Sequence, residues 1–177
     1  MKHPDWYEFD RFTLHGRTFT AFTVYDDTGD MPWEREDGHG PVSKWRPKDS
    51  KAPGEMVLCE DRGQARFYDF AAAVKLARKD GWDTKPYGTR KPGERAHAAA
   101  MADFERLRRF CAGDWGYIGV IVEDARGRQA SLWGIESDSH DYHKEVAREL
   151  ADEMIVQARE ERRRAELKHC LLGEVPA

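Results

Sequence analysis

The sequence has few cysteines, and it lacks the long apolar stretch that a membrane-spanning helix needs. Only three cysteines occur in 177 residues: Cys59, Cys111 and Cys170. Because their number is odd and no two of them form a CxxC pair, the sequence argues against a disulfide framework and against a zinc ribbon. No stretch approaches the ~20 apolar residues of a membrane helix, and the N-terminal residues show no apolar signal segment. We therefore expect a cytoplasmic protein that does not enter a membrane.

The sequence also lacks a strong excess of either charge. Lys and Arg number 29 and Asp and Glu number 33, which leaves a formal net charge of −4. Because positive and negative residues are nearly equal in number, the composition does not indicate general binding to polyanions or mimicry of DNA. Signature motifs are missing as well, because the chain has no P-loop, no GxGxxG after a strand, no GxSxG elbow and no HExxH pair. The motifs therefore indicate no reaction class.

Apolar residues are nevertheless numerous enough for a packed core, since hydrophobic residues make up 40% of the chain. Alternating and β-branched runs predict three hairpins, with strands at 7–14 and 18–25, 56–59 and 65–68, and 117–122 and 129–135. Three helices are expected, at 70–80, at 92–112 and from 138 or 139 onward. We therefore predict an α+β fold in which an antiparallel sheet of about six strands, built from hairpins, packs in two layers against the helices. We expect residues 1–177 to form a single domain.

Local signals are clearest around the first helix and the strand 117–122. Asp69 is typical of a residue that caps a helix N-terminus, and Gly81 is suited to the left-handed conformation that ends one. Trp82 would then pack back on the helix end. The strand is apolar on both faces, so we expect it at the centre of the sheet.

A long segment at about 26–53 separates the first two hairpins and is dense in Gly, Pro, Asp and Lys. Loops of this length are uncommon in compact domains and often functional. Trp33 and Trp45 predict that the loop is ordered and held to the body by their rings. Trp is also a typical anchor of protein interfaces, so both are candidate partner-binding residues.

The same loop contains one candidate for acid–base chemistry. Glu36, Asp37 and His39 are titratable groups within four positions, and a glycine stands on either side of His39. In a functional interpretation, His39 is a base or a metal ligand in a cleft. In the simpler interpretation, which we favour, Asp37 and His39 satisfy backbone groups of an ordered turn.

A second candidate lies just before and inside the last helix. Its acidic and imidazole side chains are ligands that divalent metals accept. The simpler interpretation, again favoured, is that Asp138 or Ser139 caps the helix and the acidic residues stabilise its positive end. The candidate metal ligands are Glu136, Asp138, His140 and His143.

Basic residues on two helices form a third candidate, for binding phosphates or an acidic partner. Arg159 and Arg163 lie on the last helix, and Arg106, Arg108 and Arg109 lie on the preceding one. Because glutamates are interleaved with the basic residues of the last helix at ion-pair spacing, a solvated surface is the favoured interpretation. Binding to nucleic acid is left open but is not favoured.

The cysteines each lie in or beside an apolar strand or helix. A free cysteine in such a place usually behaves as a small hydrophobic residue. We therefore do not expect a cysteine nucleophile.

Three segments resemble a group of small bacteriophage and prophage proteins that has no established activity. They are WEREDGHGPVSKWR, FYDFAAAVKLARKDGW and GVIVEDARGRQASLWGIESDSHDYHKEVARELADE, and they cover most of the chain from Trp33 to Glu153. The most specific part is SLWGIESD followed by the EVARELADE helix. The resemblance carries over no catalytic or binding residue. It implies a phage or prophage gene that is expressed in the cytoplasm of a bacterial host.

Three functional hypotheses follow. The first is a non-catalytic phage accessory protein that needs no cofactor and binds a host or phage macromolecule, for example to modulate host metabolism or defence. The second is a small hydrolase or nuclease-like enzyme that uses a divalent metal at the His39 loop or the cluster from Glu136 to His143. The third is a nucleic-acid-binding protein. The sequence indicates neither the partner nor the oligomeric state, and a site shared by His39 and His140 would favour the enzyme.

Overall fold

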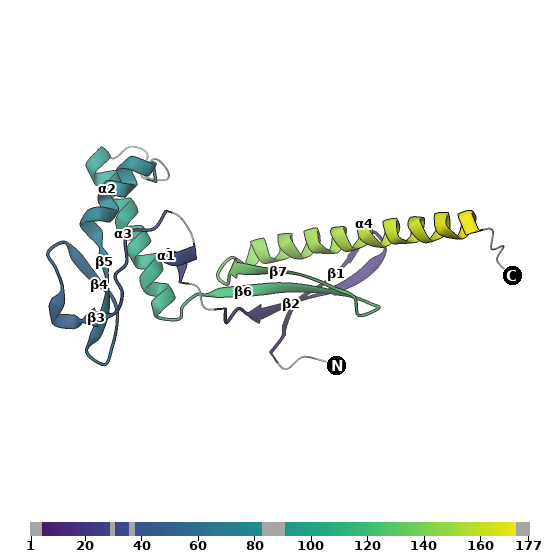
Figure 1. The fold of residues 1–177 in the computed structure, drawn as a ribbon, viewed down its shortest axis with the longest axis horizontal. Coiled ribbons are helices and arrows are strands. Elements are labelled where there is room, and N and C mark those ends of the chain that lie inside the picture. The colour runs from purple at the N-terminus through teal and green to yellow at the C-terminus, as the bar shows by residue number, and fades with distance from the viewer. Residues whose placement is uncertain (1–4, 29–30, 36–37, 83–90, 173–177) are drawn as a thin grey trace. The chain divides into compact units, whose positions relative to one another are not determined.

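The computed structural model describes residues 5–28, 31–35, 38–82 and 91–172 (Figure 1). The chain divides into two compact units. Unit 1 combines Met1–Asp27 with Gly116–Ala177, and unit 2 is the intervening segment Thr28–Trp115. Unit 2 is thus an insertion between two strands of unit 1, and each unit has a core of its own.

Unit 1 consists of an antiparallel sheet and one long helix. The described strands lie in the order β1-β2-β6-β7, so that β6 is interior. Residues His15 and Gly16 have positive φ angles of 48° and 74° and form the turn of the first hairpin. The elements are β1 (Tyr7–Leu14), β2 (Arg17–Tyr25), β6 (Tyr117–Asp124), β7 (Gln129–Glu136) and α4 (His140–Leu172).

Helix α4 packs its apolar stripe on one face of this sheet. Val146, Leu150 and Ile155 of α4 meet Phe19 of β2 and Val120 of β6 in the main core cluster. A helix of 33 residues is ~50 Å long, about twice the length of the strands it covers. In the described part of the chain, no helix combines the length and apolar character needed to cross a bilayer.

Unit 2 contains a smaller antiparallel sheet and two packed helices. Its described strands lie in the order β3-β5-β4, and Val42 forms an isolated bridge to Tyr68 of β5. Tyr68, Phe104 and Leu107 are buried at the centre of its core. The elements are α1 (Pro32–Arg35), β3 (Arg46–Pro47), a 3-10 turn (Lys48–Ser50), β4 (Glu55–Asp61), β5 (Gln64–Asp69), α2 (Phe70–Asp80) and α3 (Pro92–Cys111).

The predicted α+β class, with antiparallel strands packed against helices, is confirmed. The strands form a four-stranded and a three-stranded sheet among the described residues, where the sequence predicted one sheet. Hairpin signals are local and cannot say which hairpins pair with each other. Here the hairpin β4–β5 takes its third strand, β3, from the long loop, and it packs against helices of its own unit.

Candidate functional site

The candidate site of unit 2 is a hydrogen-bonded network around the carboxylate of Asp103 in α3. Nδ1 of His39 lies 2.5 Å from Oδ1 of Asp103, and the main-chain N–H of Gly40 donates to Oδ2 at 2.8 Å. The Tyr68 hydroxyl donates to the same Oδ2 at 2.6 Å and lies 3.2 Å from the carbonyl oxygen of Ala100. We call His39, Gly40, Tyr68 and Asp103 the Asp103 network.

Burial makes these contacts strong. The side chains of His39 and Asp103 are 14% and 8% exposed, and Tyr68 is fully buried. Burial, together with the bond to Asp103, raises the pKa of Tyr68 far above its usual value, so Tyr68 remains a hydrogen-bond donor. An imidazole whose Nδ1 faces a carboxylate has its tautomer fixed, and it exchanges protons at Nε2. The network can therefore hold the loop in place, and it can also support acid–base chemistry.

Gly40 is needed for the loop to reach this position. A Cβ built on Gly40 would overlap the Tyr68 ring and would lie 2.6 Å from Cβ of Ala73. The loop then runs beside β5, where the N–H of Asp69 donates to the carbonyl of Pro41 and the N–H of Ser43 donates to that of Phe67. Residues 39–43 are thus held to β5 by main-chain bonds as well as by the Asp103 network.

The sequence singled out two members of this network, His39 and the glycine that follows it. Glu36 and Asp37, the other catalytic candidates, lie outside the described residues. Tyr68 and Asp103 were missed, because one lies in an apolar strand and the other in a helix more than 60 positions after His39. No local pattern links these three residues, and only the packing of α3 and the loop on β5 brings them together.

At the start of α4, the candidate metal ligand His143 is buried in contacts within its own unit. His143 is only 3% exposed, and its Nε2 lies 2.8 Å from the carbonyl oxygen of Glu136. The His140 ring packs against it with centroids 5.5 Å apart, and Phe9 contacts it edge-on. Within the described ranges, no group of three or more His, Cys, Asp or Glu side chains is placed to hold a metal ion.

The two histidine candidates belong to different units. His39 lies in unit 2 and bonds to Asp103 of that unit, whereas His140 and His143 lie in unit 1. His143 is satisfied by Glu136 of unit 1. Each candidate therefore has to be judged on the contacts of its own unit.

The two loop tryptophans both lie close to one arginine. The guanidinium carbon of Arg66 lies 5.2 Å from the ring centroid of Trp33 and 5.4 Å from that of Trp45. Trp33 also packs edge-on against Phe110, while Trp45 remains 45% exposed. We call Trp33, Arg66 and Trp45 the Trp–Arg cluster. The sequence pointed to both tryptophans but not to Arg66, which β5 supplies.

The basic candidates are distributed over both units. Arg159 and Arg163 are exposed on α4 in unit 1, next to ion pairs within the helix such as Arg162 with Glu166 at 2.8 Å. On α3 of unit 2, Arg106 stacks on Trp115 at 4.1 Å, and Arg108 pairs with Glu105. The ion pairs agree with a solvated surface, whereas Arg106 is half-buried against Trp115.

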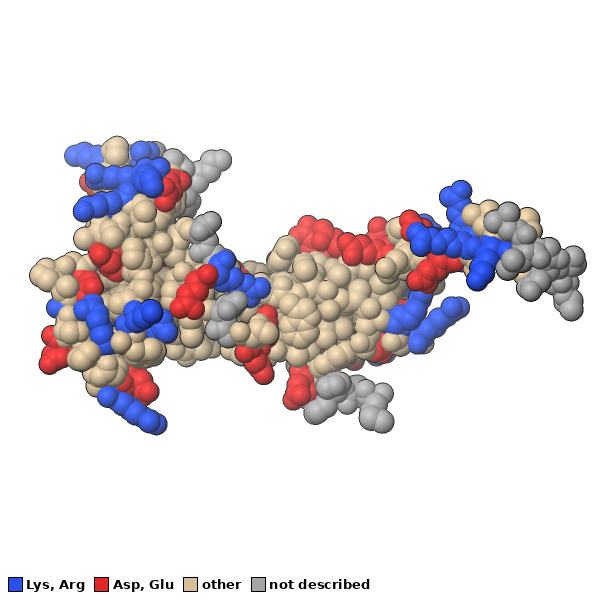
Figure 2. All heavy atoms as spheres, in the orientation of Figure 1, with Lys and Arg blue, Asp and Glu red and all other residues tan. Residues whose placement is uncertain are grey.

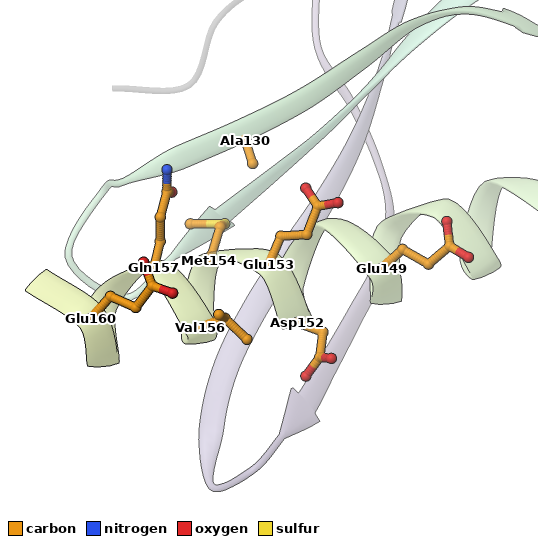
Figure 3. A pocket seen from close by; sticks show the side chains of 8 residues that line it. All are labelled: Ala130, Glu149, Asp152, Glu153, Met154, Val156, Gln157 and Glu160. Carbon is orange, nitrogen blue, oxygen red and sulfur yellow. The ribbon is translucent and has the colours of Figure 1, made fainter.

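Unit 1 also has a shallow groove of about 510 Å³ between β7 and α4 (Figure 3). Glu153 and Gln157 extend from α4 toward the strand that carries Ala130. Figure 2 shows a patch of acidic side chains over the same part of α4. The remaining lining residues are Glu149, Asp152, Met154, Val156 and Glu160. Carboxylates alone do not define a site, and two of them, Asp152 and Glu160, already face His15 and Arg164.

Comparison with protein-family models, with curated proteins and with solved structures finds no match for this chain.

Proposed function

We propose that this protein acts by binding a partner protein, and that the Trp–Arg cluster of unit 2 is its contact surface. The observation that carries the proposal is the guanidinium of Arg66 placed over both the ring of Trp33 and the ring of half-exposed Trp45. Trp and Arg are the residue types that most often dominate binding energy at interfaces. Stacking also orders Arg66 before a partner arrives, which lowers the entropy cost of binding.

The proposed setting is that of a phage or prophage accessory protein in a bacterial host. Its support is the resemblance of the segments from Trp33 to Glu153 to phage proteins. One of the three segments, WEREDGHGPVSKWR, contains both tryptophans of the cluster. The partner in this proposal is a host or phage protein.

The test is affinity capture from a lysate of phage-infected bacteria with tagged full-length protein. Wild type should recover a partner in a stoichiometric amount, and Trp45→Ala should recover at least ~10-fold less, as expected for a binding hot spot. Tyr142→Ala removes a comparably exposed ring, 49% against 45%, from unit 1 and should leave recovery unchanged. Equal recovery by wild type and Trp45→Ala, or no stoichiometric partner with wild type, would contradict the proposal.

Arg66 allows a finer test of the cluster. Arg66→Lys keeps the positive charge but loses the planar group that lies over the two rings. We expect Arg66→Lys to weaken capture nearly as much as Arg66→Ala. Full binding by the lysine variant would show that charge, and not the stacked geometry, is recognised.

A second candidate function is acid–base catalysis at His39, favoured by the 2.5 Å contact between its Nδ1 and Asp103. We propose that His39 would accept a proton from a bound substrate while Asp103 stabilises the charged imidazole. The test uses p-nitrophenyl acetate and bis-p-nitrophenyl phosphate as probes, each with and without Mn²⁺. Activity that His39→Ala abolishes would support this role. Activity that persists in His39→Ala, or no turnover of either probe by wild type, counts against it.

A further inference from the structure

One end of unit 1 contains a cleft whose charged lining is mostly arginine. Because Phe19 of β2 pairs with Asp124 of β6, the β1–β2 turn and the β6–β7 turn lie at the same end of the sheet. Helix α4 runs past this end, and Figure 2 shows Lys and Arg side chains gathered there. The cleft has a volume of about 760 Å³. Its charged lining residues are Arg17, Arg126, Arg128, Arg162, Asp124 and Glu161.

Two of these arginines have side chains that are available to a ligand. Arg17 is the first residue of β2, Arg126 lies in the β6–β7 turn, and both are exposed. Within the described part of the chain, neither side chain forms an ion pair. Arg162 of α4 differs, because its Nε donates to Glu166 of the same helix at 2.8 Å. Arg17 and Arg126 therefore bring charge into the cleft that no neighbouring carboxylate neutralises.

Arg128 is held in a fixed orientation by a buried carboxylate. Its Nε and Nη2 donate to Oδ2 of Asp124 at 2.8 and 2.7 Å, and the side chain of Asp124 is only 8% exposed. Oδ1 of Asp124 accepts the main-chain N–H groups of Arg126 and Arg128, so the same carboxylate also fixes the turn. A guanidinium has further N–H donors, which Arg128 can offer to a ligand. Because Arg128 is ordered beforehand, it loses less entropy on binding.

The chemistry of the lining favours a phosphate-bearing anion of small size. Four arginines accompany two carboxylates, and Arg128 already neutralises one of these, Asp124. The planar fork of a guanidinium matches the oxygens of a phosphate group. The described lining has no aromatic side chain on which a base could stack. The volume lies within the range of small-molecule sites, about 300–1,000 Å³, and the net charge of −4 does not favour a long polyanion.

We propose that this cleft binds the polyphosphate group of a small molecule, and that Arg17, Arg126 and Arg128 hold the phosphates. Several guanidinium groups around one cleft suit a chain of phosphates, since each phosphate adds negative charge and acceptor oxygens. The phosphates carry the recognition, because the lining provides no stacking surface for a base. The inference goes beyond the proposed partner binding, since the cleft lies in unit 1 and the Trp–Arg cluster lies in unit 2.

The test is isothermal titration calorimetry of full-length protein at low ionic strength. The probes are tripolyphosphate, ATP without magnesium, and a short DNA duplex. We expect tripolyphosphate and ATP to bind with similar Kd values that rise with added salt. ATP binding at least ~10-fold more tightly would identify a nucleotide as the source of the polyphosphate group. No binding of tripolyphosphate or ATP, or binding of the duplex alone, would overturn the proposal.

A pair of double variants tests the location of the site. Arg17→Gln with Arg126→Gln removes two exposed charges from the cleft and should weaken tripolyphosphate binding at least ~10-fold. Arg159→Gln with Arg163→Gln is the matched control, because it removes two exposed arginines of α4 that do not line the cleft. The control should change Kd by less than ~2-fold, as screening of distant charges implies. Equal weakening by both double variants would refute a site in the cleft.

Glu161→Gln tests the same site through a gain of affinity. Glu161 is the lining carboxylate that no arginine of the described chain neutralises. Its removal should lower the Kd for tripolyphosphate by ~2–5-fold, as expected for one exposed charge interaction. Loss of folding cannot produce tighter binding, so this variant keeps the test decisive if the double variants are unstable. Unchanged or weaker binding by Glu161→Gln would contradict the proposal.

Discussion

Single residues fix the geometry of unit 2, and Gly40 is the clearest example because there is no space for a side chain at its position. A methyl group at this position would overlap Tyr68 and Ala73, both of which are fully buried. We expect Gly40→Ala to lower the free energy of unfolding by ~1–3 kcal/mol, as overpacking usually does. It should also break the contact between His39 and Asp103, which the downfield imidazole N–H resonance reports in an NMR spectrum.

Gly127→Ala is the matched control for this change. Gly127 has a φ of 76° with open space around it, so alanine there costs ~1–2 kcal/mol of backbone strain without a clash. The His39 resonance should persist in Gly127→Ala. If it also persists in Gly40→Ala, the loop does not depend on the small size of residue 40.

The carboxyl group of Asp124 should make the stability of the protein depend on pH. Burial alone would raise its pKa, but hydrogen bonds from the Arg128 side chain and from the N–H groups of Arg126 and Arg128 lower it overall. A carboxyl whose pKa is lower when folded contributes stability that is fully present above its unfolded pKa of ~3.9. That contribution is lost as the pH falls through the folded pKa.

We therefore expect Asp124→Asn to cost ~1–3 kcal/mol at neutral pH, and the difference from wild type to shrink below about pH 4. Urea denaturation of both proteins at neutral and acidic pH measures this. Asp61→Asn, at an exposed position, should change stability by less than ~0.5 kcal/mol. A wild-type advantage that stayed constant down to low pH would rule out the bonded carboxylate as its source.

Single elements show which features the sequence could predict. Helix α2 was predicted with both ends, because its signals are local: the Asp69 side chain accepts the N–H of Ala72 at 2.9 Å, and Gly81 has a φ of 77°. The interior place of β6 followed from its two apolar faces. The β3–β5 pairing could not be predicted, because the two residues of β3 have no strand pattern of their own.

The candidate sites follow the same division. His39, Trp33 and Trp45 were predicted because their residue types are informative wherever they stand. Asp103 and Arg66 act only through neighbours that are remote in the sequence, so their roles depend on the register of β5 and the packing of α3. Charged residues on a helix or a strand are common, and nothing local distinguishes these two.

The N-cap of α2 gives a prediction at the scale of one element. Asp69→Ala removes the acceptor for the Ala72 N–H and should destabilise the protein by ~0.5–2 kcal/mol. Asp69→Ser keeps a capping oxygen and should recover most of this loss. Urea denaturation distinguishes the variants, and equal stability of the alanine and serine forms would show that the cap contributes little.

At the scale of the whole molecule, the chain forms two units that have separate cores. Unit 1 is assembled from both ends of the chain, because β2 pairs with β6 across the inserted unit 2. Proteins unfold locally in cooperative units. A substitution in one core should therefore first lower the protection from hydrogen exchange in the unit to which that core belongs.

Two core truncations test this division. Phe104→Ala in unit 2 and Ile155→Ala in unit 1 each remove a buried side chain, and each should cost ~2–5 kcal/mol. Hydrogen exchange followed by mass spectrometry reads the two units separately. Phe104→Ala should speed exchange in α3 and β5 while β6 and α4 stay protected, and Ile155→Ala should do the reverse. Equal loss of protection in both units from either variant would mean that the chain opens as one cooperative body, since the weaker core would then set the stability of the whole.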